Sequence, residues 1–322
     1  MDRRILYAAL LVLSTAVGSS LLITYSTQRG LGELLVTPLQ IESSQHTNAT
    51  VRIYSQYYPT YDAPIPVVLS IHGPDETASN LYAYNIELAR RNLTVVSIEI
   101  ENLNEIVTSM DEESLNQTGY ICAEVLDYIR ENYNVDDDIF GILTHAEGFQ
   151  VALRMLNFTG SPKAFVAIGA LGEVDTNLTS SITGNFLMAV GEYPDEFSLE
   201  TGQGFMEGIS GLPEIEIGRI YGNLEREDAF EIISTSEDRS SELTSSSLVA
   251  QSCEWMVKGL QGIPHFEKTL NVSMQIYQYQ RYADWILVAS VTGIGCVVLI
   301  LVLDLLRPVI QDRRANPQSD GN

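Results

Sequence analysis

Basic residues are scarce in this 322-residue chain: 18 lysines and arginines stand against 42 aspartates and glutamates, and the formal net charge is −24. A surface of this sign repels a phosphate backbone, so the composition argues against a nucleic-acid partner. An acidic, lysine-poor surface suits a salty exterior, but it is equally typical of any soluble acidic protein. Disorder is not expected, because apolar residues make up 45% of the chain and can form a core in one large domain or two ordinary ones.

Cysteine is also rare, and three cysteines cannot form a disulfide framework. Cys296 lies within an apolar run, which leaves Cys122 and Cys253 as the only possible pair. Both fall in predicted helices far apart in the sequence, so we expect two buried free thiols. The cysteines therefore do not indicate a compartment.

Charged residues are absent from two long apolar segments, 5–24 and 285–303. Each is long enough to cross a bilayer as a helix. Arginines precede the first segment and follow the second, so the positive-inside rule predicts cytoplasmic termini and an exocytoplasmic middle region. The flanking arginines are Arg3, Arg4, Arg307, Arg313 and Arg314.

The first segment has a second interpretation. Ala16-Val17-Gly18 is a small-x-small site behind a short apolar stretch and a basic start, as in a cleaved signal peptide. The apolar residues that continue beyond it, Leu21 to Ile23, favour an uncleaved anchor. Both interpretations place the middle region outside the cell membrane.

These segments predict the organisation of the chain. We expect a cytoplasmic tail (1–4), a transmembrane helix or signal anchor (5–24), a linker (25–49), an exocytoplasmic domain (50–260), a stalk (261–284), a transmembrane helix (285–306) and a cytoplasmic tail (307–322). Six Asn-x-Ser/Thr acceptors all fall between the two segments, which agrees with export and predicts a glycoprotein. They are Asn48, Asn92, Asn116, Asn157, Asn177 and Asn271.

The middle region alternates short apolar runs with longer helical patterns, which is typical of an α/β fold with a mostly parallel, doubly wound sheet. The expected strands are 51–58, 66–71, 94–100, 139–143, 163–168, 185–190 and 229–233. The expected helices are 79–91, 115–132, one that begins near residue 147, and 243–260.

Four strand ends carry a resemblance to the α/β-hydrolase fold over nearly all of residues 50–260. His72-Gly73 is similar to the first loop of that family, which helps to form the oxyanion hole. Residues 144–148, Thr-His-Ala-Glu-Gly, stand where the family has its nucleophile elbow, G-x-S-x-G. Residues 191–196 and 236–241 resemble the loops that carry the acid and the histidine.

The resemblance also implies what is missing. The nucleophile position is Ala146, which has no hydroxyl, and the base position is Arg239, whose guanidinium cannot accept a proton. Asp195 matches the acid, and Pro74 has no N–H for an oxyanion hole. Loss of the nucleophile alone costs on the order of 10⁶ in turnover, so we expect no catalysis by the usual acyl-enzyme route.

A cleft at this edge of the sheet remains possible, formed by His72, Gly73, His145 and Glu147. We expect both histidines to be packed, hydrogen-bonded core residues. Glu147 is the only nearby carboxylate that could complete a metal site with them, so we predict no metal and no cofactor.

The sequence thus predicts a membrane-anchored, non-catalytic α/β-hydrolase-like ectodomain. It would bind an unknown protein or small molecule outside the cell, or serve as a subunit of a membrane complex. The alternative is a serine-hydrolase-like esterase or peptidase with an atypical active site.

Overall fold

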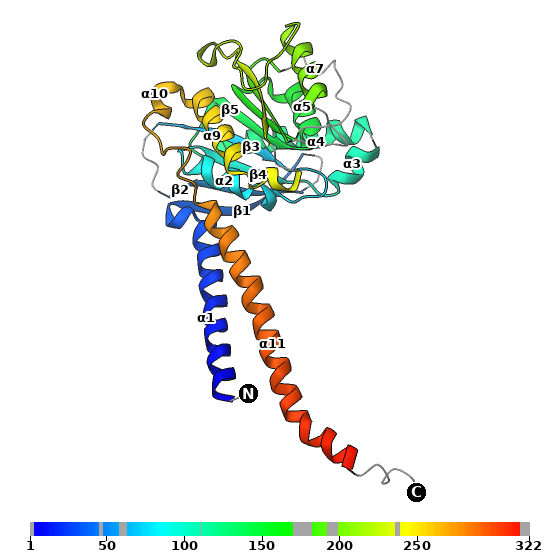
Figure 1. Cartoon of the computed structure of the whole chain (residues 1–322). Coiled ribbons are helices and arrows are strands. Elements are labelled where there is room, and N and C mark those ends of the chain that lie inside the picture. The colour runs from blue at the N-terminus through cyan, green and yellow to red at the C-terminus, as the bar shows by residue number, and fades with distance from the viewer. Residues whose placement is uncertain are drawn as a thin grey trace. The chain divides into compact units, whose positions relative to one another are not determined.

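The computed structural model describes residues 3–44, 48–57, 63–109, 111–169, 182–191, 199–235 and 239–315. The chain divides into two units, which are treated separately. One unit is residues 28–277, and the other combines residues 1–27 with 278–322. Figure 1 shows the helices and strands of both.

The larger unit contains an eight-stranded sheet of order β1-β2-β4-β3-β5-β6-β7-β8. β2 pairs antiparallel with β1 and β4, whereas all other neighbours are parallel. The expected strands and their order along the chain are confirmed. The strands are β1 (Leu34–Glu42), β2 (Asn48–Gln56), β3 (Ile65–Ile71), β4 (Thr94–Glu99), β5 (Val135–His145), β6 (Ala164–Ile168), β7 (Asn185–Gly191) and β8 (Phe230–Thr235).

The prediction of a linker over residues 25–49 is wrong for most of its length. β1 lies there and pairs with β2 from Leu34–Gln56 to Glu42–Asn48. Pro38 within the run obscures a strand pattern, yet proline is tolerated on an edge strand, where one side of the ladder is open. The domain therefore begins well before residue 50.

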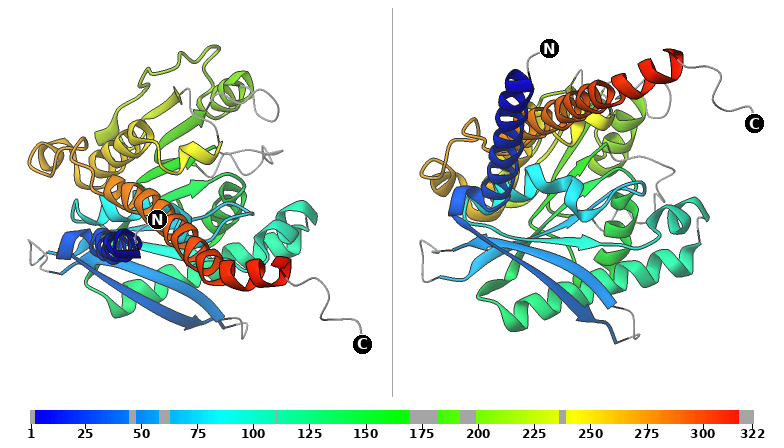
Figure 2. Two further views of the ribbon diagram at one scale, coloured as in Figure 1. Left: turned by 60° about the horizontal axis from the view of Figure 1, so that its bottom comes forward. Right: turned by 90° about the horizontal axis from the view of Figure 1, so that it is seen from below.

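Helices cover both faces of the sheet (Figures 1 and 2), and each face has its own apolar core. Leu69 of β3 packs on the α4 and α5 side, and the adjacent Val68 packs on the α2 and α9 side, as the alternation of a strand requires. The helices of this unit are α2 (Tyr82–Ala89), α3 (Leu103–Ser109), α4 (Glu112–Asn132), α5 (Gly148–Thr159), α7 (Leu199–Ser210), α8 (Arg239–Glu242), α9 (Ser246–Gln261) and α10 (Ile263–Phe266).

Local sequence explains where the long helix α4 begins and which face it buries. Asp111 caps its first turn by accepting a hydrogen bond from the Ser114 N–H. Apolar residues at helical spacing, including Cys122, Val125 and Ile129, then face the sheet. Burial raises the pKa of the Cys122 thiol to about 12, so it is inert at neutral pH. Cys122 and Cys253 are both free and buried, as the sequence predicted.

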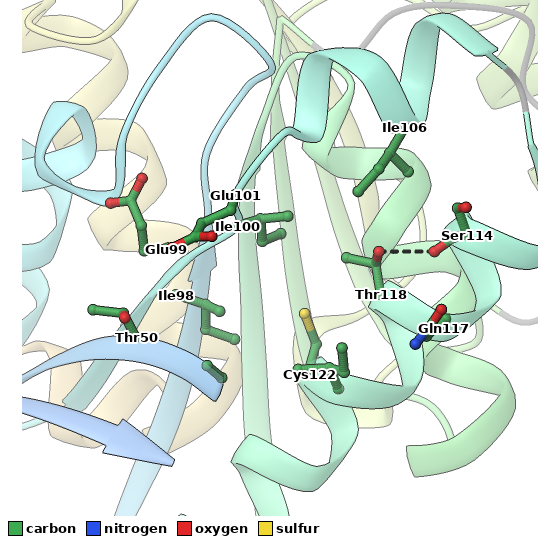
Figure 3. Close-up of a pocket in the computed structure, with 12 residues that line it drawn as sticks. Thr50, Ile98, Glu99, Ile100, Glu101, Ile106, Ser114, Gln117, Thr118 and Cys122 are labelled. Carbon is green, nitrogen blue, oxygen red and sulfur yellow. Dashed lines mark hydrogen bonds between the residues drawn. The ribbon is translucent and has the colours of Figure 1, made fainter. Parts of the chain in front are cut away.

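A cavity of about 240 Å³ lies between the end of β4 and helices α3 and α4 (Figure 3). Its lining is Ala49, Thr50, Ile98, Glu99, Ile100, Glu101, Ile106, Ser114, Gln117, Thr118, Ile121 and Cys122.

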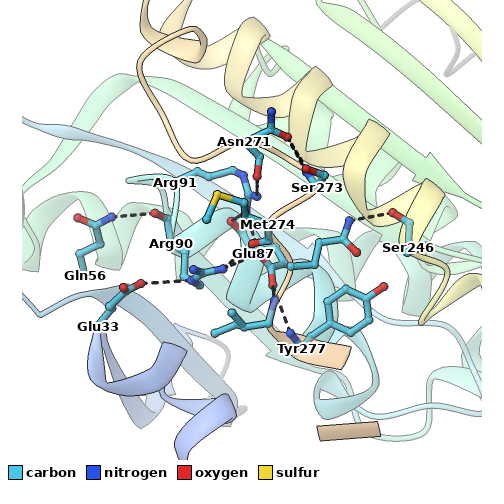
Figure 4. Close-up of polar contacts among 12 residues, drawn as sticks. Glu33, Gln56, Glu87, Arg90, Arg91, Ser246, Asn271, Ser273, Met274 and Tyr277 are labelled. Carbon is cyan, nitrogen blue, oxygen red and sulfur yellow. Dashed lines mark hydrogen bonds and ion pairs between the residues drawn. The ribbon is translucent and has the colours of Figure 1, made fainter. Parts of the chain in front are cut away.

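The prediction of a stalk over residues 261–284 is wrong for its first part. The Oε1 atom of Glu87 on α2 accepts a hydrogen bond from the Ile276 N–H at 2.7 Å, and Arg91 donates to the Asn271 carbonyl at 2.8 Å (Figure 4). Arg91 also pairs with Glu87 at 2.8 Å, and both side chains are fully buried. Tyr277 is buried as well, so the chain from 271 to 277 belongs to the packed domain.

The smaller unit contains the two long apolar helices, α1 (Arg3–Gln28) and α11 (Tyr277–Ala315). Their apolar parts, 25 residues in α1 and 30 in α11, are long enough to cross a membrane, and few of their side chains are buried. The two helices meet at Gly293, where an added β-carbon would lie 3.1 Å from the Leu13 side chain. Glycine thus permits the close contact.

Candidate functional site

The turn between β5 and α5 has the sharp geometry that the sequence predicted. Ala146 has a φ of +49°, in the left-handed region that costs a non-glycine residue energy. Its N–H donates to the Ile168 carbonyl at 2.8 Å, and its methyl is fully buried. Position 148 requires glycine, because an added β-carbon there would lie 2.4 Å from the His72 carbonyl oxygen. This turn places an alanine where the α/β-hydrolase elbow has its nucleophile.

His145, directly before that turn, lies between two carboxylates. Its Nδ1 atom is 2.7 Å from Glu76 Oε1, and its Nε2 atom is 3.4 Å from Glu242 Oε2. Glu76 comes from the loop after β3, and Glu242 comes from α8, which follows β8. Three segments distant in the sequence therefore meet at the carboxyl edge of the sheet, where α/β proteins place their ligands.

The carboxylates decide the charge of the imidazole. Burial alone would lower the pKa of His145, but Glu242 and Glu76 outweigh it and raise the pKa to about 8. Burial would likewise raise the pKa of Glu76, but hydrogen bonding and attraction to His145 hold it below its usual value. At neutral pH the arrangement is thus an imidazolium flanked by an ionised Glu76.

Glu76 also reaches the space beside the elbow. Its Oε2 atom accepts a hydrogen bond from the Gly73 N–H at 2.9 Å, and its side chain keeps 13% exposure. A β-carbon added to Gly73 would lie 3.1 Å from both Glu76 Oε2 and the Ala146 methyl, which shows that carboxylate and methyl border the same small space. A proton acceptor therefore stands next to the residue that lacks a hydroxyl.

Glu242 is held more deeply. It is fully buried, and a β-carbon added to Gly169 would lie only 2.4 Å from its Oε2 atom. Gly169 has a φ of +52°, so glycine is required there for both backbone and space. The Tyr84 hydroxyl donates to the Glu242 carbonyl at 2.6 Å and secures the segment.

His72 is a core residue, as expected. Its Nδ1 atom donates to the Gly73 carbonyl at 2.6 Å, and its Nε2 atom accepts from the Ile100 N–H at 3.0 Å. These two partners require the neutral ring. Its role is to hold the loop that carries Gly73 and Glu76 against the end of β4.

The charged cluster is not arranged as a metal site. Glu76 and Glu242 lie on opposite nitrogens of His145, so the three groups do not converge on one point. Within the described part of the chain, no group of three or more His, Cys, Asp or Glu side chains has the geometry of a metal site.

The structure describes only some of the other predicted site residues. Glu147 directly precedes α5 and is partly exposed. Asp195 lies outside the described residues, and Arg239 begins α8, although the position of its side chain is not described. The sequence did not single out Glu76 and Glu242. Both follow strand ends, but a glutamate in a loop is usually solvated, and only the fold brings these two to His145.

The six glycosylation acceptors remain predictions. Asn157 and Asn271 are exposed and Asn116 is partly exposed, so a sugar could be attached at these three positions. Asn92 is only 9% exposed and has a φ of +63°. Asn48 begins β2 with its side chain not described, and Asn177 lies outside the described residues.

Comparison with known proteins identifies the fold. No protein-family model matches the sequence, and no curated protein does either. A Pyrococcus furiosus esterase is similar over 70% of this chain and 92% of its own, with 12% identity and a TM-score of 0.52. A Klebsiella pneumoniae protein assigned as a dienelactone hydrolase is similar over 71% of this chain and 99% of its own, with 11% identity and a TM-score of 0.55. A dienelactone hydrolase of Anabaena variabilis is also similar over 71% of this chain and 99% of its own, with 13% identity and a TM-score of 0.50.

At these identities the likeness shows the fold alone: a mixed eight-stranded α/β sheet of α/β-hydrolase type. The three structures named above are all named as hydrolases, which goes against the prediction of a non-catalytic ectodomain and agrees better with the alternative, a hydrolase. That prediction rested on Ala146, Arg239, Asp195 and Pro74, and it treated His145 as a packed core residue. It did not foresee that Glu76 and Glu242 would stand at the two ring nitrogens of His145.

Proposed function

We propose that residues 28–277 form a hydrolase of esters or peptides in which Glu76, and not a residue at position 146, begins the reaction. The observation that carries this proposal is the position of the Glu76 carboxylate beside Ala146, held by the Gly73 N–H at 2.9 Å and by His145 at 2.7 Å. The hydrolases of similar fold support the class of reaction.

The proposed reaction uses water as the nucleophile. The water oxygen attacks the substrate carbonyl while Glu76 takes a proton from the water. Glu76 then gives that proton to the leaving alkoxide or amine as the C–O or C–N bond breaks. Glu76 is ionised at neutral pH and can therefore accept the proton, and its lowered pKa makes it a weaker base than an ordinary glutamate. Helix α5 begins at Gly148, two residues after Ala146, and its amino end favours the negative charge that develops on the carbonyl oxygen.

The role of His145 in this scheme is to position Glu76. Its cationic ring holds the carboxylate in one orientation from the buried side, and Glu242 holds the ring from the opposite side. The buried imidazolium also stabilises the ionised form of the base.

The test is hydrolysis of a panel of short p-nitrophenyl esters and chromogenic peptides by the full chain in detergent. We expect turnover above the buffer rate, and a Glu76→Gln variant to be slower by roughly 10²–10⁴-fold, the usual contribution of a general base. Glu214→Gln, an exposed residue outside the site, is the matched control and should keep full activity. If no substrate is turned over, or if Glu76→Gln is as active as the parent, Glu76 is not the base.

We further propose that α1 and α11 anchor this domain in a cell membrane, with the domain exocytoplasmic and both termini cytoplasmic. Large apolar side chains such as Val12, Trp285 and Val288 are more than 60% exposed along the two helices, which favours a lipid environment. In sealed right-side-out vesicles, added protease should degrade the domain and spare a tag on either terminus. Protection of the domain would reverse the proposed orientation.

A further inference from the structure

Helices α4 and α5 pack against one another on one side of the sheet, and two pairs of side chains join them across the seam (Figure 1). Arg154 of α5 donates a hydrogen bond to Glu112 of α4 at 2.9 Å. One turn further along α5, the ring of Phe158 meets the ring of Tyr120 edge to face, with 5.2 Å between the centroids. The seam therefore carries a charged pair at one contact and an aromatic pair at the next.

Asn116 lies between these two contacts on α4. It stands four residues after Glu112 and four residues before Tyr120, and side chains at this spacing share one face of a helix. Asn116 is partly exposed, and Asn-Gln-Thr at 116–118 is an acceptor for N-glycosylation. A sugar on this asparagine would emerge between the charged pair and the aromatic pair.

The aromatic pair has the properties that a sugar ring requires of its partner. Phe158 is 49% exposed, although it is a large apolar side chain. The Tyr120 hydroxyl shares a hydrogen bond with Ser44 Oγ at 3.4 Å, which restrains the second ring. The face of an aromatic ring is negative and attracts the C–H groups of a sugar. Arg154 and Glu112 offer charged partners for the hydroxyl and amide groups of the same sugar.

We propose that Asn116 carries an N-linked glycan whose first sugar ring packs on Tyr120 and Phe158 and stabilises the contact between α4 and α5. Asn157 is also an acceptor and directly precedes Phe158, but adjacent residues of a helix point in different directions. Asn116 is therefore the acceptor that faces the pair. The inference rests on the proposed exocytoplasmic orientation and is independent of the proposed hydrolysis, because none of its residues belongs to the Glu76 cluster.

The experiment uses the full chain produced in yeast, which attaches N-linked glycans to exported segments, and purified in detergent. Glycopeptide mass spectrometry should find Asn116 occupied. Endoglycosidase H then trims each glycan to its first sugar ring, so that thermal unfolding reports on this ring without the outer sugars. Asn116→Gln should lower the melting temperature of the trimmed protein by about 2–4 °C, the size of shift that the loss of one favourable contact gives in a domain of this length.

A second substitution separates stacking from the general effect of an attached sugar. In a Phe158→Ala background, Asn116→Gln should change the melting temperature by about 1 °C or less. The same asparagine change should also be neutral in bacterially produced protein that carries no glycan. Ser273→Ala, which removes the acceptor at Asn271, is the matched control and should have equal effects with and without Phe158.

The outcomes distinguish this inference from the proposed orientation. Equal losses of stability from Asn116→Gln in the two Phe158 backgrounds would overturn the contact with the aromatic pair. Sugar at Asn271 with Asn116 bare would overturn the site and leave the orientation intact. A chain without sugar at any acceptor would contradict the exocytoplasmic orientation, and this inference with it.

Discussion

The Nδ1 atom of His145 lies 2.7 Å from Glu76 Oε1, although 69 positions separate the two residues in the sequence. This contact ties the loop after β3 to the end of β5, next to the alanine of the elbow. The imidazole that this contact holds, with Glu242 at its other ring nitrogen, has a protonation state that is coupled to folding.

Stability should depend on pH through His145. Its folded pKa is about 8, above the ordinary 6.5, so the folded state binds the proton more tightly than the unfolded chain does. This contribution is complete below about pH 6.5 and is lost as the pH rises through about 8. The melting temperature of the full chain should therefore fall between pH 6.5 and 8.5.

A His145→Gln variant provides the control for that measurement. It should be less stable at pH 6 and should lose the fall in melting temperature over the same window. Glu76 acts in the opposite direction, because its lowered pKa stabilises the fold above its ordinary pKa of 4.5 and ceases to do so as the pH falls below it. A parent protein whose melting temperature is flat from pH 6.5 to 8.5 would contradict the assigned charge of His145.

Substitution of Gly169 tests the packing around Glu242. A Gly169→Ala change adds a methyl 2.4 Å from Glu242 Oε2 at a φ of +52°, so it should destabilise the domain by roughly 1–3 kcal/mol. Urea unfolding followed by circular dichroism measures this. Gly208→Ala on α7, where an added β-carbon meets nothing within 4 Å, should be neutral or stabilise by up to about 1 kcal/mol. Equal effects of the two variants would refute the close contact.

The buried network around Glu87 should hold the segment before α11 on the domain. Glu87→Ala leaves Arg91 buried without its carboxylate and removes the acceptor of the Ile276 N–H, so we expect a loss of roughly 3–5 kcal/mol. Limited proteolysis should cut residues 261–277 faster in this variant. Glu254→Gln breaks the more exposed pair with Lys258 and should cost about 1 kcal/mol or less. A Glu87 variant as resistant as the parent would show that the network does not hold this segment.

A serine restored at the elbow should not become a nucleophile. Ala146→Ser supplies the hydroxyl, but both nitrogens of His145 face carboxylates and both nitrogens of His72 bind the main chain. No described imidazole at this edge of the sheet is therefore placed to take its proton. A fluorophosphonate probe should leave the variant unlabelled, while a serine hydrolase added to the same sample is labelled. Labelling at position 146 would show that a base lies among the residues of the histidine loop.

Local patterns in the sequence determined most of the elements of the fold. Continuous apolar runs such as 66–71 predicted the buried strands, and apolar residues at helical spacing predicted α4, because these periods follow from backbone geometry alone. The sharp turn at Ala146 also followed from a strand, a short motif and a helix in that order. The edge strand β1 escaped this reasoning, since Pro38 interrupts its pattern.

Only the tertiary structure decided what stands around that turn. Nothing local distinguishes Glu76 and Glu242 from solvated glutamates. They become a site because the loop after β3 and the helix after β8 meet His145 at one edge of the sheet. In the same way, the contacts of Glu87 convert an expected stalk into part of the domain. Such pairings depend on the order of the strands in space. That order decides which residues distant in the sequence come into contact, and these contacts set how deeply each side chain is buried and whether His145 is protonated.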